Sequence, residues 1–336
     1  MRRSGKEAIS KEIVTKILKS ITKKNVLVIG DSMIDEYLLG NVQRISPEAP
    51  VPVFELESRK YVLGGAANTA NNLVSLGSSV SLLTIVGQDE SSKIFKTLCK
   101  NSNIKTDLFI IDKSRPTTLK SRVMVGNHQI VRIDNEKKHI CDDDINSQIL
   151  NYVKRNCSIF DAVVFSDYAK GMLNRELVLN LIEIIKHNNK IIFSDPVPST
   201  LDFYKGIDLI KPNKLEVESF LGEKFNIDYT NAEEIGNKLK SKTGSDFVIT
   251  LGKDGMLFNK NGEYEIISTF SKEVFDVSGA GDTAMAALAL ARTCKFTMKE
   301  SVMFANICSG IVVGKIGTAT CSIDEIYTYL DEHLNK

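Results

Sequence analysis

A glycine-rich turn that ends in an aspartate is the stretch of this sequence best suited to chemistry. It reads DVSGAGD over residues 276–282 and leads into a run of small, helix-forming residues at 284–291. The glycines at 279 and 281 would let the backbone turn tightly and approach a ligand. The unpaired N–H groups and positive dipole end of the following helix would attract an anion, in particular a phosphate being transferred. Asp282, at that helix start, could accept a proton from a hydroxyl that attacks the phosphorus.

A purely structural explanation of this turn has to be weighed beside the chemical one. Ser278 could simply cap a helix that follows a glycine-rich turn. On the turn alone the two interpretations are close to even. The alanine-rich helix favours phosphate transfer, because small side chains let a helix lie deep against a sheet, where a mere surface cap would not be found.

Two widespread nucleotide-binding motifs are absent from the sequence. It contains no GxxxxGK[ST], which excludes a Walker-type ATPase, and no GxGxxG follows the first predicted strand. The turn after that strand reads GDSMID at 30–35 and is predicted to be the first β-to-α turn. Asp31 and Asp35 suit hydrogen bonds to neutral hydroxyls, as on a sugar, and would repel a pyrophosphate. Capping of a helix N-terminus is their alternative role.

Two further segments could bind ligands at the start of a helix. In GGAAN at 64–68, Gly64 and Gly65 would allow close approach, and Asn68 offers a donor and an acceptor to a polyol. A plain loop-to-helix turn is the alternative. Asn213 and Glu216, one helical turn apart, could hold phosphate oxygens and Mg²⁺ through water, or could form only a capping box.

Short β-branched segments alternate with helix-like segments along most of the chain. The strand candidates are short, mostly apolar runs without alternation at 26–29, 80–86, 162–166, 191–194, 209–210 and 247–251. The helix-like segments include 66–76, 177–187 and 232–243. Apolar runs without alternation are typical of strands covered on both faces, and alternation of β and α units implies parallel strands. The sequence therefore predicts an α/β fold with a mostly parallel central sheet flanked by helices.

Two stretches, near 37–62 and 116–134, break this alternation. They contain extended segments at 51–56, 119–125 and 129–134 with no helix between them. We expect a small antiparallel sheet there, either as a packed hairpin layer or as a lid over the carboxyl ends of the parallel strands. Residues 25–336 are predicted to form one domain with this lid, and residues 1–24 a leader helix packed on it. A membrane-surface helix is the weaker alternative for 1–24, which lacks aromatic anchors.

The composition narrows the class of protein. The 336 residues include 43 Lys and Arg against 42 Asp and Glu, so no overall field favours nucleic acid or an anionic membrane. The 6 cysteines form no CxxC pair and no cluster with histidine at zinc spacing, which indicates free thiols in a reducing compartment. No apolar run near the N-terminus is long enough for a signal peptide or membrane span. We therefore expect a cytoplasmic protein.

Together these features resemble the ribokinase-like (PfkB) family of carbohydrate kinases. DVSGAGDT at 276–283 matches the family's C-terminal signature and GGAAN at 64–68 its N-terminal one, in the right order. Within the family the sequence is most similar to the bacterial heptose-7-phosphate kinases. The markers of this similarity are RISPEAPVPV at 44–53, SDYAKG at 166–171 and VVGKIGT at 312–318.

The resemblance implies that ATP, with Mg²⁺, phosphorylates C1 of D-glycero-D-manno-heptose 7-phosphate to the 1,7-bisphosphate, a precursor for lipopolysaccharide or surface glycans. Asp282 would be the base, and the amides of Gly279, Ala280 and Gly281 would bind the anion. The positions implied for Mg²⁺, phosphates and nucleotide are Asn213, Glu216, Thr250, Gly252, Asp254, Gly255 and Asn306. Those implied for the sugar are Asp31, Asp35, Gly64, Gly65 and Asn68. Asp276 and Ser278 match positions where relatives bind a monovalent cation such as K⁺.

A 7-phosphate needs cations, and the lid stretches supply candidates: Arg44, Lys120, Arg122 and Arg132. Solvated charge on a strand face is their alternative role. One departure from the heptose kinases concerns the stretch after the strand at 191–194, where they often read Asp-Pro-Lys-Gly and this chain has Val197. A kinase for another sugar or nucleoside, and a catalytically silent sugar-phosphate-binding protein, are the rival functions. Relatives often dimerise through the lid, whose free edges invite pairing, so we expect a homodimer.

Overall fold

The computed structural model describes residues 9–225, 227, 230–260, 262–270, 276–315 and 317–333. The first eight residues of the predicted leader segment and Ile316 of the VVGKIGT motif lie outside this part of the chain. The centre of the fold is a nine-stranded sheet in the order β13-β12-β11-β10-β9-β8-β1-β4-β5. Its strands are β1 (Asn25–Gly30), β4 (Ser79–Val86), β5 (Phe109–Ile111), β8 (Ala162–Asp167), β9 (Ile191–Pro196), β10 (Leu209–Ile210), β11 (Asp246–Thr250), β12 (Met256–Lys260) and β13 (Glu263–Ile267).

This sheet is parallel from β11 to β5, and only β12 and β13 at one edge run antiparallel. The side chains of β1 show why: Val26 and Val28 pack into one hydrophobic cluster and Leu27 and Ile29 into another on the opposite face. Apolar residues at consecutive positions are needed because both faces are covered. The predicted mostly parallel α/β sheet is confirmed.

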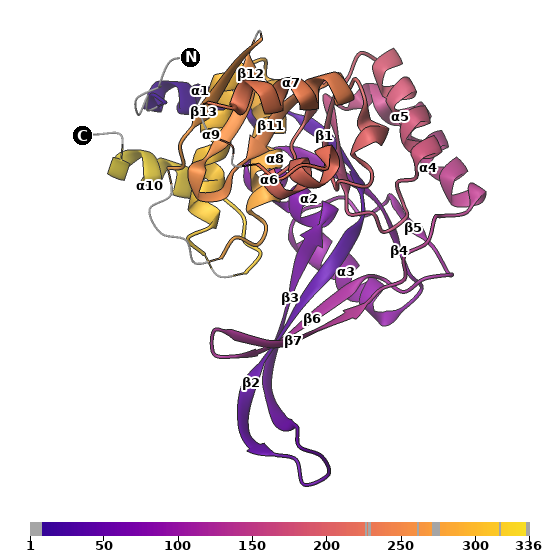
Figure 1. Ribbon diagram of the computed structural model, residues 1–336. Helices are drawn as coiled ribbons and strands as arrows, with labels where there is room; N and C mark the ends of the chain where they lie inside the picture. Colours follow the sequence, from indigo (N-terminus) through magenta and orange to yellow (C-terminus); the bar gives the residue numbers. More distant parts are fainter. Residues whose placement is uncertain are drawn as a thin grey trace.

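Helices cover both faces of the sheet (Figure 1). One face packs against α1 (Lys11–Ile21), α2 (Ala66–Ser75), α3 (Glu90–Asn101), α8 (Ala280–Thr293), α9 (Met298–Val312) and α10 (Ile323–His333). The other packs against α4 (Asp143–Asn156), α5 (Arg175–His187), α6 (Lys214–Leu221) and α7 (Ala232–Thr243). Short 3-10 turns are η1 (Cys157–Ile159), η2 (Leu201–Tyr204) and η3 (Gly252–Asp254). Helix α8 is buried from Asp282 to Ala291, because its alanines let it lie close to its neighbours α2 and α9.

The lid is a separate four-stranded sheet in the order β3-β2-β6-β7, which extends away from the body in Figure 1. Its strands are β2 (Ser32–Ile45), β3 (Pro52–Gly65), β6 (Leu119–Val125) and β7 (His128–Asn135). The prediction of a small antiparallel sheet is confirmed, with the addition that β2 and β6 run parallel.

The prediction of a first β-to-α turn at 30–35 is wrong. Strand β1 passes through Asp31 directly into β2, which pairs with β3 from Ser32↔Gly65 outward, so no helix follows. Helix capping by Asp31 and Asp35 is thereby excluded. The pairing with β3, more than 15 residues later in the chain, decides this conformation, and local pattern did not reveal it.

Strands β1 and β8 form the point where the order of the parallel sheet reverses. From β1 the chain builds outward to β4 and β5, and from β8 it builds the other way to β9, β10 and β11. Ligands of open α/β sheets bind at such a point, beyond the carboxyl ends of the strands. Within the described residues, no helix combines the length and the hydrophobicity that crossing a bilayer requires.

Candidate active site

Asp282 lies in the first turn of α8 and accepts three hydrogen bonds from two other parts of the chain. Asn68 Nδ2 donates to Oδ2 at 2.7 Å, and Thr69 Oγ1 and Tyr168 Oη donate to Oδ1 at 3.0 and 2.9 Å. Burial, aided by the nearby Asp195 carboxylate, raises the pKa of Asp282 to about 6, although the three donors act in the opposite direction. A carboxylate with such a pKa is suited to accept a proton near neutral pH.

The turn before Asp282 brings the backbone close to the same cluster. Gly279 has φ +80°, and a Cβ on it would lie 2.9 Å from Nδ2 of Asn68 and 3.0 Å from Cγ2 of Thr318. Helix α8 begins at Ala280, so its first N–H groups lie beside Asp282. Gly279, Ala280 and Gly281 thus lie beside the carboxylate of Asp282.

A buried ion pair that the sequence analysis missed stands beside this turn. Lys211 Nζ lies 3.0 Å from Oδ2 of Asp195, and a Cβ on Gly281 would be 3.5 Å from Nζ. Burial lowers the pKa of Lys211, but the carboxylates of Asp195 and Glu216 outweigh it, so the group stays charged. Burial raises the pKa of Asp195 to about 6. The available signal was position, because Asp195 ends β9 and Lys211 follows β10, at the ligand-binding edge of the sheet.

On the sugar side, Asp35 faces Gly64, the first glycine of the GGAAN segment. A Cβ on Gly64 would lie 2.5 Å from Oδ2 of Asp35, and Arg122 Nη1 donates to Oδ1 at 2.6 Å. Gly65 has φ +59° and no room for a side chain, because its Cβ would lie 2.4 Å from the carbonyl oxygen of Asp31. Asp35, Gly64, Gly65 and the base-bound Asn68 therefore meet between lid and body.

Asp31 has a different position from the one predicted. Its carboxylate is buried, and Oδ2 accepts the backbone N–H groups of Tyr168 and Lys170 at 3.1 and 2.9 Å. Burial and the neighbouring Asp167 raise the pKa of Asp31 to about 6. Its Oδ1 has no hydrogen-bond partner among the described residues. Asp31 thus fixes the backbone of the loop at 168–171, and its carboxylate is buried under that loop and not exposed to a ligand.

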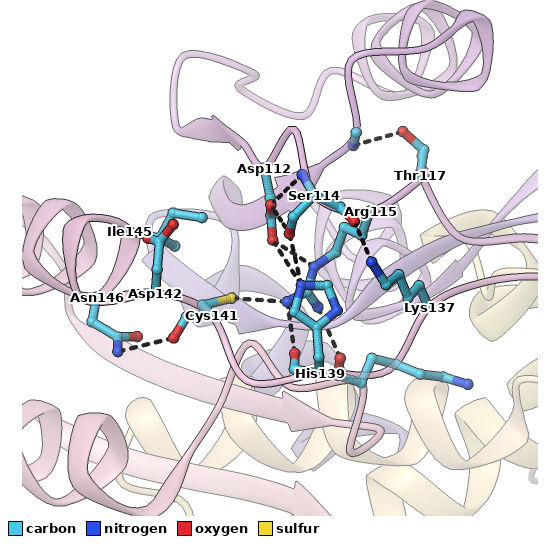
Figure 2. Close-up of polar contacts among 12 residues, drawn as sticks. Asp112, Ser114, Arg115, Thr117, Lys137, His139, Cys141, Asp142, Ile145 and Asn146 are labelled. Carbon is cyan, nitrogen blue, oxygen red and sulfur yellow. Dashed lines mark hydrogen bonds and ion pairs between the residues drawn. The ribbon is translucent and has the colours of Figure 1, made fainter.

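Arg115 braces this loop, and Figure 2 shows it beside Asp112 and His139. Its guanidinium donates to Asp112 Oδ2 at 2.6 Å, to the carbonyl of Lys170 at 2.9 Å and to that of His139 at 2.6 Å. These contacts join the end of β5, the 168–171 loop and the segment between β7 and α4. Both side chains of the Asp112–Arg115 pair are buried, which makes the pair a rigid structural unit.

Ser114 and His139 in Figure 2 do not form a nucleophile–base pair. Ser114 Oγ donates to Asp112 Oδ1 at 2.5 Å and lies 2.7 Å from His139 Nε2. Because the Ser114 hydroxyl donates its hydrogen to Asp112, it can only accept a hydrogen bond from His139 Nε2. Nε2 therefore carries a proton and has no lone pair with which to deprotonate Ser114. The remaining ring nitrogen, Nδ1, is buried without a partner among the described residues. The arrangement of a serine hydrolase, with an acid behind the histidine, is absent here.

The lid turns a group of cations toward the sugar side. Lys120, Arg122 and Arg132 share one face of the lid with Asp35, since paired positions in neighbouring strands point the same way. Lys120 is partly buried, and burial together with the charge of nearby Lys170 lowers its pKa. Within the described residues the ammonium of Lys120 has no hydrogen bond or ion pair, whereas that of Lys170 pairs with Glu136. Lys170 is a member of this group that the sequence analysis missed.

Arg44 is separated from this group. It lies nine positions beyond Asp35 in β2, about 30 Å farther along the strand at the usual rise per residue. Its exposed side chain lies 3.9 Å from Glu55 on the neighbouring strand. Within one chain Arg44 therefore does not reach the predicted phosphate site, and the prediction is corrected on this point.

The residues predicted on the nucleotide side lie at the other end of the site. Asn213 and Glu216 form a reciprocal capping box at the start of α6, with hydrogen bonds of 2.9 and 2.7 Å. A backbone bridge places Asn213 beside Thr250, and Gly252, Asp254 and Gly255 form the turn that follows. Asn306 is buried, and its amide bonds the backbone of Ser268 and Phe270 at 2.9 and 3.3 Å. Its side chain thus holds the segment after β13 and is not free for a base.

Asp276 connects two segments at the edge of the site. Its carboxylate accepts the N–H groups of Ser278 and Gly317, each at 2.9 Å. Burial raises the pKa of Asp276, but these donors outweigh it, so the net shift is downward and the group is ionised. An ionised carboxylate with lone pairs to spare fits a nearby monovalent cation.

The described residues contain no group of three side chains able to enclose a metal ion. Glu216 has one carboxylate oxygen outside the capping box, and it lies near enough to Asp195 and Lys211 to shift both pKa values. A Mg²⁺ held mainly by nucleotide phosphates and water, with Glu216 in the outer shell, fits this donor set.

Comparisons with known proteins identify the family of this chain. The model of the pfkB family of carbohydrate kinases matches residues 23–325. The bifunctional protein HldE of Sulfurimonas denitrificans is 42% identical over 316 residues, which cover 94% of this chain and 65% of that protein. HldE of Helicobacter pylori (strain Shi470) is 39% identical over 310 residues, 92% of this chain and 67% of that protein. This chain thus spans about two thirds of the length of these relatives.

Solved structures of kinases share the fold. Escherichia coli phosphofructokinase-2 in complex with potassium aligns with a TM-score of 0.75 and 17% identity, over 92% of this chain and 99% of that one. A putative ribokinase from Agrobacterium tumefaciens aligns with a TM-score of 0.74 and 17% identity, over 94% and 99%. At this identity the likeness shows the ribokinase-like fold alone. The family match over most of the chain adds the activity, and the chain therefore belongs to the pfkB family of carbohydrate kinases.

Proposed function

We propose that this kinase uses ATP to phosphorylate C1 of D-glycero-D-manno-heptose 7-phosphate, giving the 1,7-bisphosphate. One observation carries the proposal: Asp282 lies between a sugar-side cluster with lid cations and a buried lysine, Lys211, at the anion turn. Such a site can bind a charged sugar at one end and a transferring phosphoryl group at the other.

In this mechanism Asp282 accepts the proton of the C1 hydroxyl as its oxygen attacks the γ-phosphorus of ATP. The backbone N–H groups of the 279–281 turn and the ammonium of Lys211 stabilise the charge on the transferred group. When bound, Mg²⁺ neutralises the nucleotide phosphates. Asn213 and Glu216 hold the end of β10 to the start of α6, and the turn at 252–255 would border the nucleotide.

At the acceptor end, Asp35 and Asn68 can bind sugar hydroxyls. The 7-phosphate would lie against Lys120, whose ammonium has no partner among the described residues, with Arg122, Arg132 and Lys170 around it. Burial and the charge of Lys170 lower the pKa of the Lys120 ammonium, and a bound phosphate would raise that pKa again.

The choice of a heptose rests on the RISPEAPVPV, SDYAKG and VVGKIGT segments and on the similarity to proteins named HldE. Val197 replaces a lysine often found in the heptose kinases. Lys211 places a positive charge beside Gly281, where it could bind the substrate or nucleotide phosphate that a lysine at position 197 would otherwise contact. The product would serve lipopolysaccharide or surface-glycan precursors made in the cytoplasm.

A substrate panel tests the proposal. ATP consumption is measured with heptose 7-phosphate, fructose 1- and 6-phosphates, ribose and adenosine, and ³¹P NMR locates the new phosphate. We expect the highest kcat/KM with heptose 7-phosphate and a new anomeric phosphate signal. A higher kcat/KM with another acceptor would assign a different sugar kinase, and no turnover with any acceptor would favour a silent binding protein.

Recognition of the 7-phosphate is tested by Lys120→Met. We expect KM for the sugar phosphate to rise about tenfold or more with little change in KM for ATP, since a charged contact to phosphate is lost. The control is Lys113→Met, an exposed lysine in the segment between β5 and lid strand β6. Equal KM values for both variants would remove Lys120 from the phosphate site.

Two further features complete the proposal. The lid exposes apolar side chains at the hairpin tip (Ile45 and Val51) and on its edge strand (Ile130 and Ile133), which supports a homodimer through the lid. Sedimentation of wild type and Ile45→Asp tests it, and a monomer at micromolar wild-type concentration would contradict it.

Asp276 and Ser278 are proposed to hold K⁺, which predicts faster turnover in KCl than in NaCl at equal ionic strength.

A further inference from the structure

Tyr168 reaches the base from the loop after β8. Its hydroxyl donates to Oδ1 of Asp282 at 2.9 Å, and a Cβ on Gly65 would lie 3.4 Å from the edge of its ring. We propose that Tyr168 is a positioning residue for the base, which keeps the carboxylate of Asp282 ionised and correctly oriented until the acceptor hydroxyl binds. This inference rests on the proposed role of Asp282 and does not depend on which sugar is the acceptor.

The donors to Asp282 differ in their surroundings. Asn68 and Thr69 stand on α2 and are almost completely buried, so their hydrogen bonds are part of the packed body. Tyr168 belongs to a loop and is partly exposed at the site. An acceptor hydroxyl that approaches Oδ1 of Asp282 therefore contacts Tyr168 before the two buried donors. Tyr168 is the donor whose hydrogen bond to Oδ1 the acceptor hydroxyl can replace.

The loop that carries Tyr168 is fixed from three sides. Asp31 accepts the N–H groups of Tyr168 and Lys170, and Asp167 Oδ1 accepts that of Ala169 at 2.8 Å. Arg115 donates to the carbonyl of Lys170. Ala169 has φ +51°, a left-handed conformation that a residue with a side chain keeps only where its surroundings impose it. This framework aims the Tyr168 hydroxyl at Asp282.

The charges around Asp282 explain why it needs such a donor. Asp195 lies near Asp282 and disfavours its ionised form, while Lys211 favours it. Asp35 acts on the phenol of Tyr168. Burial and the carboxylates of Asp282 and Asp195 hold the pKa of the Tyr168 phenol well above its usual range. The phenol thus remains a hydrogen-bond donor and keeps its proton. In the reaction the C1 hydroxyl proton passes to Asp282 as the new O–P bond forms and the bond between the γ-phosphorus and the ADP oxygen breaks.

Tyr168→Phe tests this role through the pH dependence of kcat/KM, which reports the free enzyme. A donor to the ionised form lowers the pKa of a carboxylate, so its loss should move the acid limb upward, by about one pH unit. The control is Tyr264→Phe, which removes a hydroxyl that donates to Asn237 at 2.7 Å outside the site. A sugar phosphate itself titrates near pH 6, but it affects all three enzymes alike.

A second measurement needs no substrate. The ¹³Cγ resonance of Asp282, assigned by its absence in Asp282→Asn, is titrated in the ligand-free protein. We expect a higher midpoint in Tyr168→Phe than in wild type and Tyr264→Phe. Coincident midpoints and coincident acid limbs in the three proteins would overturn the proposal, even if Tyr168→Phe were slower. A shifted midpoint in a protein without heptose kinase activity would support the positioning role while contradicting the proposed substrate.

Discussion

Nδ2 of Asn68 lies 2.7 Å from Oδ2 of Asp282, so the first turn of α2 is joined directly to the first turn of α8. Thr283 Oγ1 adds a second bond between the helices, to Asn72 Oδ1 at 2.8 Å. The two glycine-rich segments of the sequence thereby become one site. The connection also brings a carboxylate into the protein interior, where its ionised form is disfavoured.

The first prediction concerns the stability of Asp282→Asn. The folded-state pKa of Asp282, about 6, lies above the ordinary aspartate value of 3.8, so ionisation favours unfolding as pH rises through this interval. An uncharged amide can pair with Asn68 and the hydroxyls of Thr69 and Tyr168 without that penalty. We expect a gain of up to about 3 kcal/mol at pH 8, seen as a Tm several degrees higher, and a much smaller gain at pH 4.5. Thermal melts over this pH range check it, and a variant less stable than wild type at pH 8 would contradict it.

The second prediction concerns the buried pair of Lys211 and Asp195. Lys211→Met removes a positive charge beside the 279–281 turn and leaves Asp195 buried without its partner. Turnover should fall about 100-fold or more, and Tm should also fall. The double variant Lys211→Met/Asp195→Asn removes both charges, so it should recover most of the Tm while remaining inactive. A double variant that regains wild-type turnover would show that the lysine serves only the fold.

The third prediction compares two arginines with ion pairs of similar length. Arg115 lies 2.6 Å from Asp112 with side-chain exposures of 5% and 4%, and Arg175 lies 2.7 Å from Asp202 with 56% and 34%. Arg115→Ala leaves a buried carboxylate and two carbonyls without their donor, and should lower the free energy of unfolding by about 3–5 kcal/mol. Arg175→Ala should lower it by less than about 1 kcal/mol. Denaturant titrations decide this, and equal effects would contradict the bracing role.

The fold was largely predictable from sequence because its signals are local. The strands at the centre of the sheet are mostly apolar runs without alternation, as for β1, β4 and β8, and both faces bury them. The antiparallel lid followed from alternation without helices. The exit from β1 was mispredicted because the strand after Asp31 is fixed by pairing with β3, and no local pattern encodes that partner.

The candidate site was predictable only where a motif names the residue. Asp282, Asn68 and Gly279 were found through their segments, but the hydrogen bond between Asn68 and Asp282 spans 214 positions. Tyr168 lies in the SDYAKG segment and Lys211 directly follows β10, but their contacts with Asp282 and Asp195 arise only when folding brings these parts of the chain together. Arg44 is the opposite case. It belongs to the specific RISPEAPVPV motif, but it lies near the lid tip, too far from Asp282 to contribute to the site within one chain.

The measurement that tests the central claim most directly is the turnover of Asp282→Asn with ATP and D-glycero-D-manno-heptose 7-phosphate. The amide keeps the size of the side chain and hydrogen bonds to its neighbours, but it cannot accept the hydroxyl proton. We predict that the variant binds both ligands with nearly wild-type affinity and that kcat falls about 100-fold or more. A folded Asp282→Asn protein that phosphorylates the sugar at the wild-type rate would contradict the assignment of Asp282 as the base.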